Sequence, residues 1–456
     1  MARMLSRIRK LFRPQVTAAD DGGLPRPRVV PRGEHGITPS RISPAARRVL
    51  EGLHEAGFRA CLVGGGVRDL LLGREPKDFD VTTDATPEQV RKLFRSARII
   101  GRRFRIVHVR FGREIVEVAT FRANDPDAVN TDADGRIISD NVYGTIETDA
   151  LRRDFTVNAL YYDHADGSVL DFAGGMADLE AGRLRLIGDP DVRFREDPVR
   201  MLRAVRFAAK LGFVIEPAVQ EAIFRQAPML EGIAPARLFE EVLKLFHAGY
   251  AVETFEQLRH YGLFRYLFPM TDALLDEEEQ GFPHMFAIRA LENTDRRINA
   301  GKPVTPAFLF AVLLWEPLRA RALALQEEGL PEAQALQAAA SEVIAEQSRH
   351  ISIPRRFSLP MREIWLLQAR LRQTRGKRPF RTLEQPRFRA AYDFLCLRAQ
   401  AGEQELEPLC QWWTRFQEVD EAERERMTRG AGGGRKKSRR RRPRKRRGGT
   451  RKPAES

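Results

Sequence analysis

Two aspartates separated by one residue, shortly after a triple glycine, constrain the fold of this chain more than any other feature. They lie in residues 61–81, CLVGGGVRDLLLGREPKDFDV. The pattern predicts a buried strand at 60–63 and a second strand that carries the aspartates. Because side chains two apart on a strand point the same way, Asp78 and Asp80 are expected to share one side. Two such carboxylates repel each other unless a cation lies between them, which predicts a magnesium site.

The triple glycine, Gly64, Gly65 and Gly66, leads from the first strand into a helix. Glycine lets a backbone approach a ligand closely, and the free N–H groups at a helix N-terminus favour phosphate. Arg68, one turn into the helix, is expected to add a charge-assisted contact. Taken singly, a triple glycine is more often only a turn, and an Asp-x-Asp pair is more often solvated. Their order along the chain favours the metal and phosphate site.

A third acid, Glu117, is embedded in an apolar run. Residues 105–111 and 114–121 alternate in character and meet at Gly112-Arg113, which predicts a β-hairpin. Within the second strand a lone carboxylate would be costly, and this favours Glu117 as a third metal ligand. Two Mg²⁺ ions held by these acids would support an in-line displacement at phosphorus.

The positive charge of the chain is concentrated at its ends. The formal net charge is +15, and residues 429–452 contain 14 Lys and Arg and no acid. Such an end suits a polyanion, either nucleic acid or an anionic membrane. Residues 1–13 place apolar side chains at helical spacing among Arg and Lys, so they are read as a transit peptide, a peripheral membrane contact or a basic disordered start.

The pattern is mixed α/β up to about residue 187 and helical after Pro198. With 456 residues the chain is long enough for two to four packed units. The expected division is a basic, Pro-rich disordered extension at 1–42, a catalytic head at 43–187, a helical neck at 188–270, a helical body with an arginine-rich RNA-binding region at 271–420, and a disordered basic tail at 421–456.

The cysteines bear on the cellular compartment. Cys61, Cys396 and Cys410 are too few and too widely spaced for a disulfide framework or a thiolate metal site. A reducing compartment and a cytoplasmic location are therefore expected.

Three stretches resemble the tRNA nucleotidyltransferase/poly(A) polymerase family of the class II nucleotidyltransferase superfamily. They are residues 61–81, residues 151–163 (LRRDFTVNALYYD) and residues 195–213 (REDPVRMLRAVRFAAKLGF). The likeness extends over residues 40–270. It implies an α/β head with a mixed nucleotidyltransferase sheet, followed by all-α neck, body and RNA-binding segments.

The resemblance also implies roles for individual residues. It implies two catalytic Mg²⁺ ions at Asp78, Asp80 and Glu117, and ATP as the substrate. Asp154 joins these three acids as a catalytic position. The nucleotide-binding positions fall on Gly64, Gly65, Arg68, Arg152, Arg153, Glu196, Asp197, Arg200 and Arg203.

The later motifs also have structural readings. Asp154 could cap a helix within an ion pair, and Asp197-Pro198 is a good helix start. Against this, Arg200, Arg203 and Arg206 recur every third residue beside an apolar helix face, and such an arginine stripe needs an anion or a base edge.

Two features favour the poly(A) polymerase branch of the family. Residues 99–105, IIGRRFR, resemble a short signature of bacterial poly(A) polymerases, although they could simply be a strand start with basic edge residues. The second is the long basic tail, because an enzyme that extends many RNA 3′ ends gains from sequence-independent phosphate contacts, whereas a dedicated tRNA enzyme needs no such tail. Residues 351–400 also fit, because they interleave basic and aromatic side chains in a pattern typical of single-stranded RNA binding. A helical bundle with a buried aromatic core would give the same pattern, and for Trp412 and Trp413 core burial is the expected outcome.

The predicted reaction is template-independent transfer of AMP from ATP to an RNA 3′-hydroxyl, with release of pyrophosphate. The expected partners are the 3′ ends of mRNA and of regulatory and structured RNAs, with RNA-decay nucleases and helicases. The alternatives are a tRNA CCA-adding enzyme and a non-catalytic RNA-binding protein on an inactive nucleotidyltransferase scaffold.

Overall fold

A computed structural model describes residues 26–101, 105–123, 130–131, 137–139, 142–276 and 285–429. The predictions made for residues 1–13, for Arg102 to Phe104 and for the tail from 430 onward lie outside these ranges. The chain divides into two compact units, an N-terminal unit (Met1–Leu359) and a C-terminal unit (Pro360–Ser456). Each unit is described by itself below.

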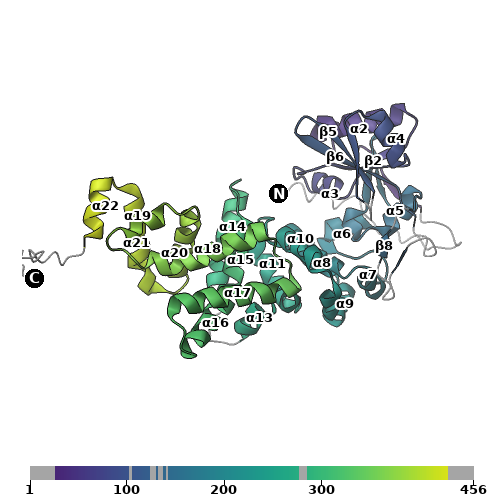
Figure 1. The fold of residues 1–456 in the computed structure, drawn as a ribbon. Coiled ribbons are helices and arrows are strands. Elements are labelled where there is room, and N and C mark those ends of the chain that lie inside the picture. Colours follow the sequence, from purple (N-terminus) through teal and green to yellow (C-terminus); the bar gives the residue numbers. More distant parts are fainter. Residues whose placement is uncertain are drawn as a thin grey trace, which may run out of the picture. The chain divides into compact units, whose positions relative to one another are not determined.

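A mixed eight-stranded sheet forms the head of the N-terminal unit, as the sequence predicts (Figure 1). The strand order is β1-β10-β9-β2-β3-β6-β5-β4. Every neighbouring pair is antiparallel except β3 and β6. The strands are β1 (Arg28–Val30), β2 (Ala60–Val63), β3 (Asp80–Thr83), β4 (Ala97–Ile100), β5 (Ile106–Phe111), β6 (Glu114–Thr120), β9 (Leu160–Asp163) and β10 (Val169–Asp171). The predicted hairpin is β5–β6.

Helices cover the sheet because their apolar faces match it. In α2 the residues Val49, Leu50 and Leu53 are fully buried, and α2 packs on β2, β3 and β6. The start of α4 has the capping box of Thr86 and Gln89 that its sequence predicts. The head elements besides the sheet are α2 (Pro44–Glu55), α3 (Gly65–Leu71), α4 (Pro87–Leu93), α5 (Ile146–Arg152), α6 (Gly175–Ala181) and the short pairs β7 (Asn130–Thr131) with β8 (Ile137–Ser139) and β11 (Arg183–Leu184) with β12 (Val214–Ile215).

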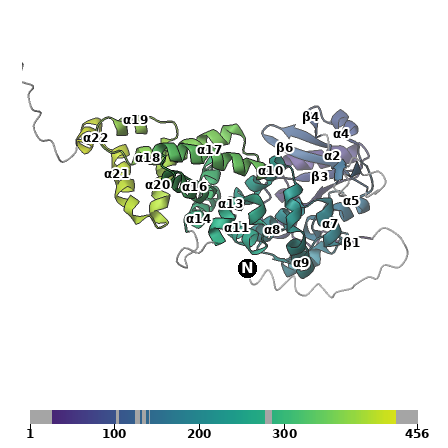
Figure 2. The ribbon, with the colours of Figure 1, turned by 60° about the horizontal axis from the view of Figure 1, so that its bottom comes forward.

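The rest of the N-terminal unit is helical (Figure 2). Its helices are α7 (Pro190–Glu196), α8 (Val199–Leu211), α9 (Pro217–Gln226), α10 (Pro235–Phe246), α11 (Ala251–His260), α12 (Phe264–Leu267), α13 (Pro269–Asp276), α14 (Met285–Asn299), α15 (Pro306–Leu313), α16 (Trp315–Glu327) and α17 (Glu332–His350). Short 3₁₀ turns lie at Pro39–Arg41 and Thr156–Asn158 in the head, at Ala227–Gly232 among these helices, and at Gln404–Leu406 in the C-terminal unit. No helix in the described ranges has the length and apolarity that crossing a bilayer requires.

The C-terminal unit is a small helical bundle around buried tryptophans. Trp413 is fully buried, its indole Nε1 donates to the carbonyl oxygen of Leu371 at 2.8 Å, and Phe388 packs on its ring. The helices are α18 (Arg355–Leu371), which begins in the preceding unit, α19 (Arg378–Leu383), α20 (Phe388–Gln400), α21 (Glu407–Glu418) and α22 (Glu421–Thr428). Burial of Trp413 agrees with the expected core role. Trp412 is only half-buried and stacks on Phe416.

Three expectations about the chain ends and the cysteines are wrong. Residues 28–30, within the extension expected to be disordered over 1–42, form β1 and pair with β10. Residues 421–428, within the tail expected to be disordered from 421, form α22, which Asp420 caps. Cys396 and Cys410 form a disulfide between α20 and α21. Sequence spacing misled here because helix packing brings the two cysteines together.

Candidate active site

One face of the sheet carries a row of residues across five strands, and all but Val63 have a polar group. Residues directly opposite each other in neighbouring strands point to the same face. Tyr161 of β9 is opposite Val63, and Val63 is opposite Asp80. Asp80 in turn is opposite Glu117, which is opposite His108 of β5. The register therefore places Asp80 and Glu117 side by side on neighbouring strands.

β3 begins at Asp80, so the expectation that one strand carries both aspartates is wrong for Asp78, which precedes the strand. Phe79 between them is buried, whereas Asp78 is exposed and Asp80 half-buried. The pKa of Asp80 is raised to about 6 by burial and by the negative charges of Glu117 and Asp78, while Arg153 opposes the shift. A carboxylate held among other carboxylates in this way is suited to a cation.

Glu117 is the more open member of this group. Its side chain is 52% exposed, and its Oε1 lies 3.3 Å from Nε2 of His108. Among the residues that the structure describes, no three His, Cys, Asp or Glu side chains are gathered closely enough to hold a metal ion as they stand. The donor set of two neighbouring Asp carboxylates and an adjacent Glu nevertheless fits Mg²⁺, which prefers oxygen ligands.

The glycine bend lies against these acids. Gly64 has φ +72°, a conformation that favours glycine, and it caps α3. A Cβ at this position would lie 3.7 Å from Nη1 of Arg153 and 4.0 Å from Oδ2 of Asp80. A Cβ on Gly65 would lie 3.6 Å from Nη2 of Arg68. The bend thus brings backbone close to the Asp80 carboxylate and to two guanidinium groups.

Arg68 is not open to solvent in this structure. Its side chain is 2% exposed, and it donates to Oδ1 of Asp69 at 2.7 Å and to Oδ1 of Asn158 at 2.6 Å. Its guanidinium also lies 5.3 Å from the ring centre of Phe207 on α8. These contacts give Arg68 a part in joining α3 to neighbouring elements.

Arg153 and Asp154 hold the head and the neck together. Arg153 donates to Oδ2 of Asp149 at 3.0 Å and to the hydroxyl of Tyr161 at 2.9 Å. Asp154 accepts from Nε of Arg203 at 2.8 Å, and from Asn158. Burial alone would raise the pKa of Asp154, but the charge and hydrogen bonds of Arg203, helped by Asn158 and a backbone N–H, lower it to about 2.

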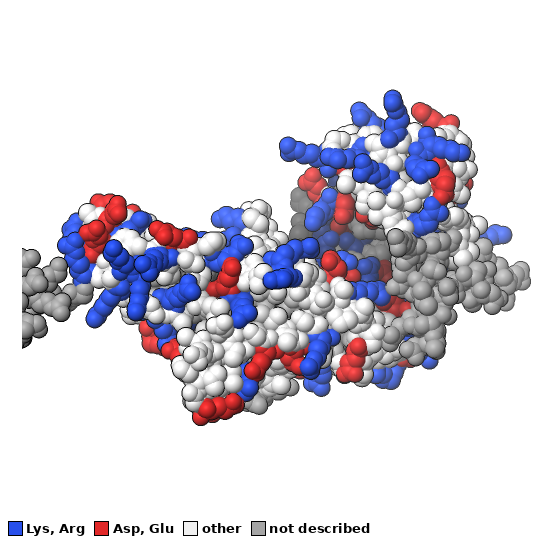
Figure 3. Space-filling model, viewed as in Figure 1, with Lys and Arg blue, Asp and Glu red and all other residues white. Residues whose placement is uncertain are grey.

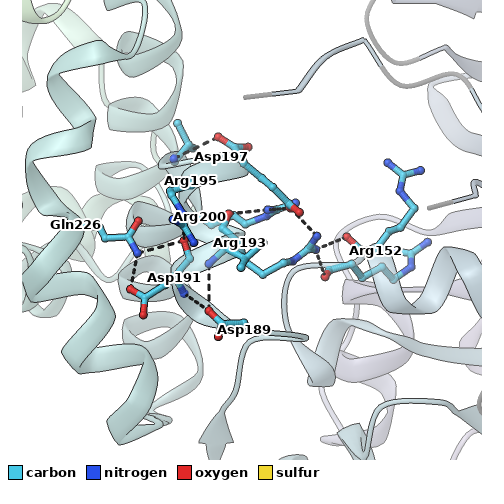
Figure 4. Close-up of polar contacts among 12 residues, drawn as sticks. Arg152, Asp189, Asp191, Arg193, Arg195, Asp197, Arg200 and Gln226 are labelled. Atoms are coloured by element: carbon cyan, nitrogen blue, oxygen red, sulfur yellow. Dashed lines mark hydrogen bonds and ion pairs between the residues drawn. The ribbon is translucent and has the colours of Figure 1, made fainter. Parts of the chain in front are cut away.

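Arg152 lies among several other arginines (Figure 4). Burial and the charges of Arg122, Arg193 and Arg200 lower its pKa to about 10, and Glu196 opposes them. Arg193 donates to the carbonyl oxygen of Arg153 at 2.7 Å. Arg193 and Arg200 each donate to Oε2 of Glu196 at 2.7 Å. One carboxylate thus serves two guanidinium groups, and the cluster retains an excess of positive charge suited to an anion.

Asp197 is held from another helix. It accepts from Nη2 of Arg237 on α10 at 2.6 Å and from the backbone N–H of Val199 at 3.2 Å. Sequence reasoning missed Arg237, Arg193 and Asp149. Arg193 stands three residues before its partner Glu196, and Asp149 stands four residues before its partner Arg153. These helical spacings could have revealed both residues. For Arg237, 40 residues from Asp197, no local signal exists.

Three family descriptions match the chain. "Poly A polymerase head domain" matches residues 60–185, "Probable RNA and SrmB- binding site of polymerase A" matches residues 212–275, and "Polymerase A arginine-rich C-terminus" matches residues 328–447. The head-domain match lies within the range expected for the head, 43–187. The arginine-rich match overlaps the range expected for the arginine-rich region, 271–420.

Two relatives that align in sequence along most of the chain are poly(A) polymerases. Poly(A) polymerase I of Salmonella typhimurium is 50% identical over 411 residues, which are 88% of each chain. That of Haemophilus influenzae is 47% identical over 88% of this chain and 90% of its own. The CCA-adding enzyme of Bacillus subtilis is 38% identical, but over only 47% of this chain and 53% of its own.

Solved structures share the fold. The Bacillus stearothermophilus CCA-adding enzyme in complex with CTP superposes with a TM-score of 0.57 at 26% identity, over 82% of this chain and 83% of its own.

Proposed function

The chain belongs to the poly(A) polymerase I family, and from that premise we propose that it adds AMP from ATP to RNA 3′ ends without a template. The polymerase relatives align along 88% of the chain, head to arginine-rich segment, whereas the CCA-adding relatives align along about half of it. The observation that carries the proposal is the site itself: Asp80 opposite Glu117, beside Asp78 and the Gly64 bend.

Asp78, Asp80 and Glu117 would hold the two Mg²⁺ ions. When bound, these ions would lower the pKa of the attacking 3′-hydroxyl and neutralise charge on the leaving pyrophosphate. The chain's own contribution is positioning: the sheet register fixes Asp80 against Glu117, and the bend at Gly64 lies close to Asp80 and Arg153. The covalent change is attack of the 3′-oxygen on the α-phosphorus as the bond to pyrophosphate breaks.

The arginines around Arg152 would bind the nucleotide. The excess positive charge of Arg122, Arg152, Arg193 and Arg200 suits the ribose and phosphates of ATP. Arg200 and Asp197 would face the base, and both are held in place, Arg200 by Glu196 and Asp197 by Arg237. Because fixed donors and acceptors select one base edge, this arrangement supports a preference for ATP alone.

The C-terminal unit would bind RNA by charge. Between Glu363 and Glu384 there is no acid. The stretch between them carries six exposed basic side chains, Arg370, Arg372, Arg375, Lys377, Arg378 and Arg381, here called the basic stretch. Figure 3 shows Lys and Arg gathered on one face of this unit. The backbone N–H of Gly376 donates to the carbonyl oxygen of Thr428 at 3.2 Å, so the end of α22 lies beside this stretch. Since Trp365 and Trp413 are buried, phosphate contacts rather than stacking support RNA binding here.

The test is nucleotide incorporation by the full chain. Purified protein, Mg²⁺ and a 3′-hydroxyl RNA are incubated with each nucleoside triphosphate singly, and with tRNA lacking its 3′ end. Long extension with ATP alone is expected. Addition limited to C, C and A on the truncated tRNA would favour the CCA-adding alternative. Absence of incorporation, with RNA still bound, would leave only an RNA-binding protein.

The remaining expectations stay predictions. RNA-decay nucleases and helicases as partners follow from the family setting, and a peripheral membrane contact follows from the basic, amphipathic residues 1–13. A cytoplasmic location was expected from the few cysteines. Co-purification from cells before and after RNase treatment would separate protein partners from RNA-mediated ones.

A further inference from the structure

Two cysteines of the C-terminal unit have a chemistry that the proposed reaction does not use. Cys396 of α20 and Cys410 of α21 are joined as a disulfide, with 5.2 Å between their Cα atoms and 14 residues between them in sequence. Both residues are half-buried rather than enclosed. The third cysteine, Cys61, is fully buried in the head, and its pKa is raised to about 12, chiefly by burial. Because thiol chemistry needs access and a thiolate, it is expected at the pair and not at Cys61.

The two helices that carry the pair are also joined by contacts without sulfur. The hydroxyl groups of Tyr392 on α20 and Thr414 on α21 lie 2.6 Å apart. Arg398, near the end of α20, donates to Oε1 of Glu403 at 2.7 Å and to Oε1 of Gln368 on α18 at 3.1 Å. The two helices share one apolar core, formed by Phe388, Ala391, Leu395, Ala399, Trp413 and Phe416. The unit is therefore expected to stay folded when the pair is reduced, as a reversible site requires.

The basic stretch rests on one of these two helices. Phe380 of α19 lies within the stretch and packs on Phe416 of α21, with the ring centres 5.4 Å apart. Leu383, at the end of α19, packs on the same core. Because α21 also carries Cys410, a bond from Cys410 to α20 restricts the helix on which the basic stretch is mounted. The redox state of the pair is thereby coupled to the surface proposed to bind RNA.

The cysteine content of the chain bears on how such a cross-link behaves. The sequence, with three cysteines in 456 residues, predicts a reducing compartment. In such a compartment disulfides are typically transient or redox-sensing, since thiols are kept reduced until an oxidant acts. Two half-buried cysteines on packed helices that hold together without them fit a pair that changes state better than a permanent cross-link.

We propose that Cys396 and Cys410 form a reversible thiol–disulfide site, oxidised by a low-molecular-weight disulfide such as glutathione disulfide, and that the cross-link tightens RNA attachment through the basic stretch. The thiolate of one cysteine attacks the glutathione disulfide and releases one glutathione thiolate. The thiolate of the other cysteine then attacks the mixed disulfide and releases the second. The pair loses two electrons and two protons, which the two glutathione thiols gain. The effect on RNA rests on the proposed function, whereas the cysteine chemistry does not.

The cross-link acts on RNA binding by preorganisation. A basic stretch mounted on a fixed helix loses less conformational freedom when RNA binds than one mounted on a helix that moves. The basic side chains are the same in both states, so the dependence of affinity on salt is unchanged. The expected result of oxidation is an RNA affinity about threefold higher with the same salt slope.

The experiment measures free thiols and RNA binding on the same full-length samples. The chain is equilibrated in glutathione buffers of increasing disulfide content, and its free thiols are counted by alkylation and mass spectrometry. RNA affinity is measured by fluorescence anisotropy without ATP. Cys396→Ser and Cys410→Ala each remove the pair, and circular dichroism checks that they fold. Cys61→Ala keeps the pair and is the matched control for the loss of one thiol.

The pair should lose both thiols together as the disulfide content rises, and RNA affinity should rise at the same midpoint. Both changes should persist in Cys61→Ala and be absent from Cys396→Ser and Cys410→Ala. A pair that keeps one state at every glutathione ratio, or a cross-link that forms without changing RNA affinity, would overturn the proposal. Because neither measurement involves turnover, a chain that responds as expected but incorporates no nucleotide would refute the proposed function alone.

Discussion

The two units use arginine in opposite ways. In the N-terminal unit the arginines around the site are buried and share carboxylates: Arg193 and Arg200 are 8% and 12% exposed and both donate to Glu196. In the C-terminal unit the basic stretch is exposed and has no acid within it. A buried, paired arginine fixes geometry and concentrates charge at one point, whereas an exposed, unpaired one attracts any polyanion. On the proposed function, the buried arginines would serve catalysis and the exposed ones general RNA attachment.

The largest expected effect comes from removing the carboxylate of Asp80, which should affect catalysis and leave RNA binding intact. Asp80→Asn should reduce AMP incorporation by at least about 10³-fold, because no other carboxylate lies opposite Glu117 in the strand register. RNA affinity should change less than about twofold, since the exposed arginines are untouched. Incorporation assays and anisotropy measure the two effects. Glu55→Gln, an exposed acid on α2, serves as the control, and loss of RNA binding in Asp80→Asn would contradict the assignment.

The units should also differ in their response to reductant. Cys396 and Cys410 are 14 residues apart, so their cross-link should stabilise the C-terminal unit by about 3 kcal/mol through loop-closure entropy. Cys61 in the N-terminal unit is a buried free thiol whose pKa is raised to about 12, chiefly by burial. Thermal unfolding with and without dithiothreitol should therefore shift only the transition of the C-terminal unit.

A Cys396→Ser variant provides the matched control. Its unfolding should be independent of dithiothreitol and should resemble that of the reduced parent. Equal sensitivity of both transitions, or none in the parent chain, would contradict the difference between the units.

The buried ion pair of Asp154 and Arg203 should make the free energy of unfolding depend on pH in the acid range. The pKa of Asp154 is about 2 in the folded chain against 3.8 for the ordinary group. Because the folded value is depressed, the stabilisation is complete above about pH 4 and is lost as the pH falls through about 2; it amounts to about 2 kcal/mol. Urea unfolding of Arg203→Met should show a loss of that size at neutral pH and a flatter profile below pH 4. An unchanged acid profile would show that the pair contributes nothing.

The exposed arginines should give the smallest effect. Replacing Arg372, Arg375 and Arg378 by Gln should weaken RNA binding about tenfold and lower the salt slope by about two, with incorporation at saturating RNA unchanged. The matched control replaces Arg389, Arg415 and Arg426, which are exposed in the same unit but ion-paired. Equal effects of the two triple variants would mean that pairing does not distinguish these arginines.

Local sequence patterns predicted the secondary-structure elements that are stabilised by interactions between nearby residues. The strand, glycine bend and helix at 60–71, the capping box at Thr86 and the β5–β6 hairpin follow from propensities within a few residues. An acid within an apolar strand pointed to Glu117, but its side chain is 52% exposed, so the expected cost of burying it does not apply and its role stays a prediction. By contrast, β1 is a three-residue edge strand in a Pro-rich segment, and its pairing energy comes from β10, far along the chain.

The order of its motifs along the chain determined that this protein has a mixed-sheet head with a pair of neighbouring carboxylates, followed by helices and a basic end. Tertiary structure alone decided which arginines are free. It buried Arg68 against Asp69 and Asn158, clamped Asp197 with Arg237 from another helix, and left Arg206 without an acid. The physical reason is that a charge is compensated by whatever lies within a few ångströms in space, and these neighbours are tens of residues away in sequence.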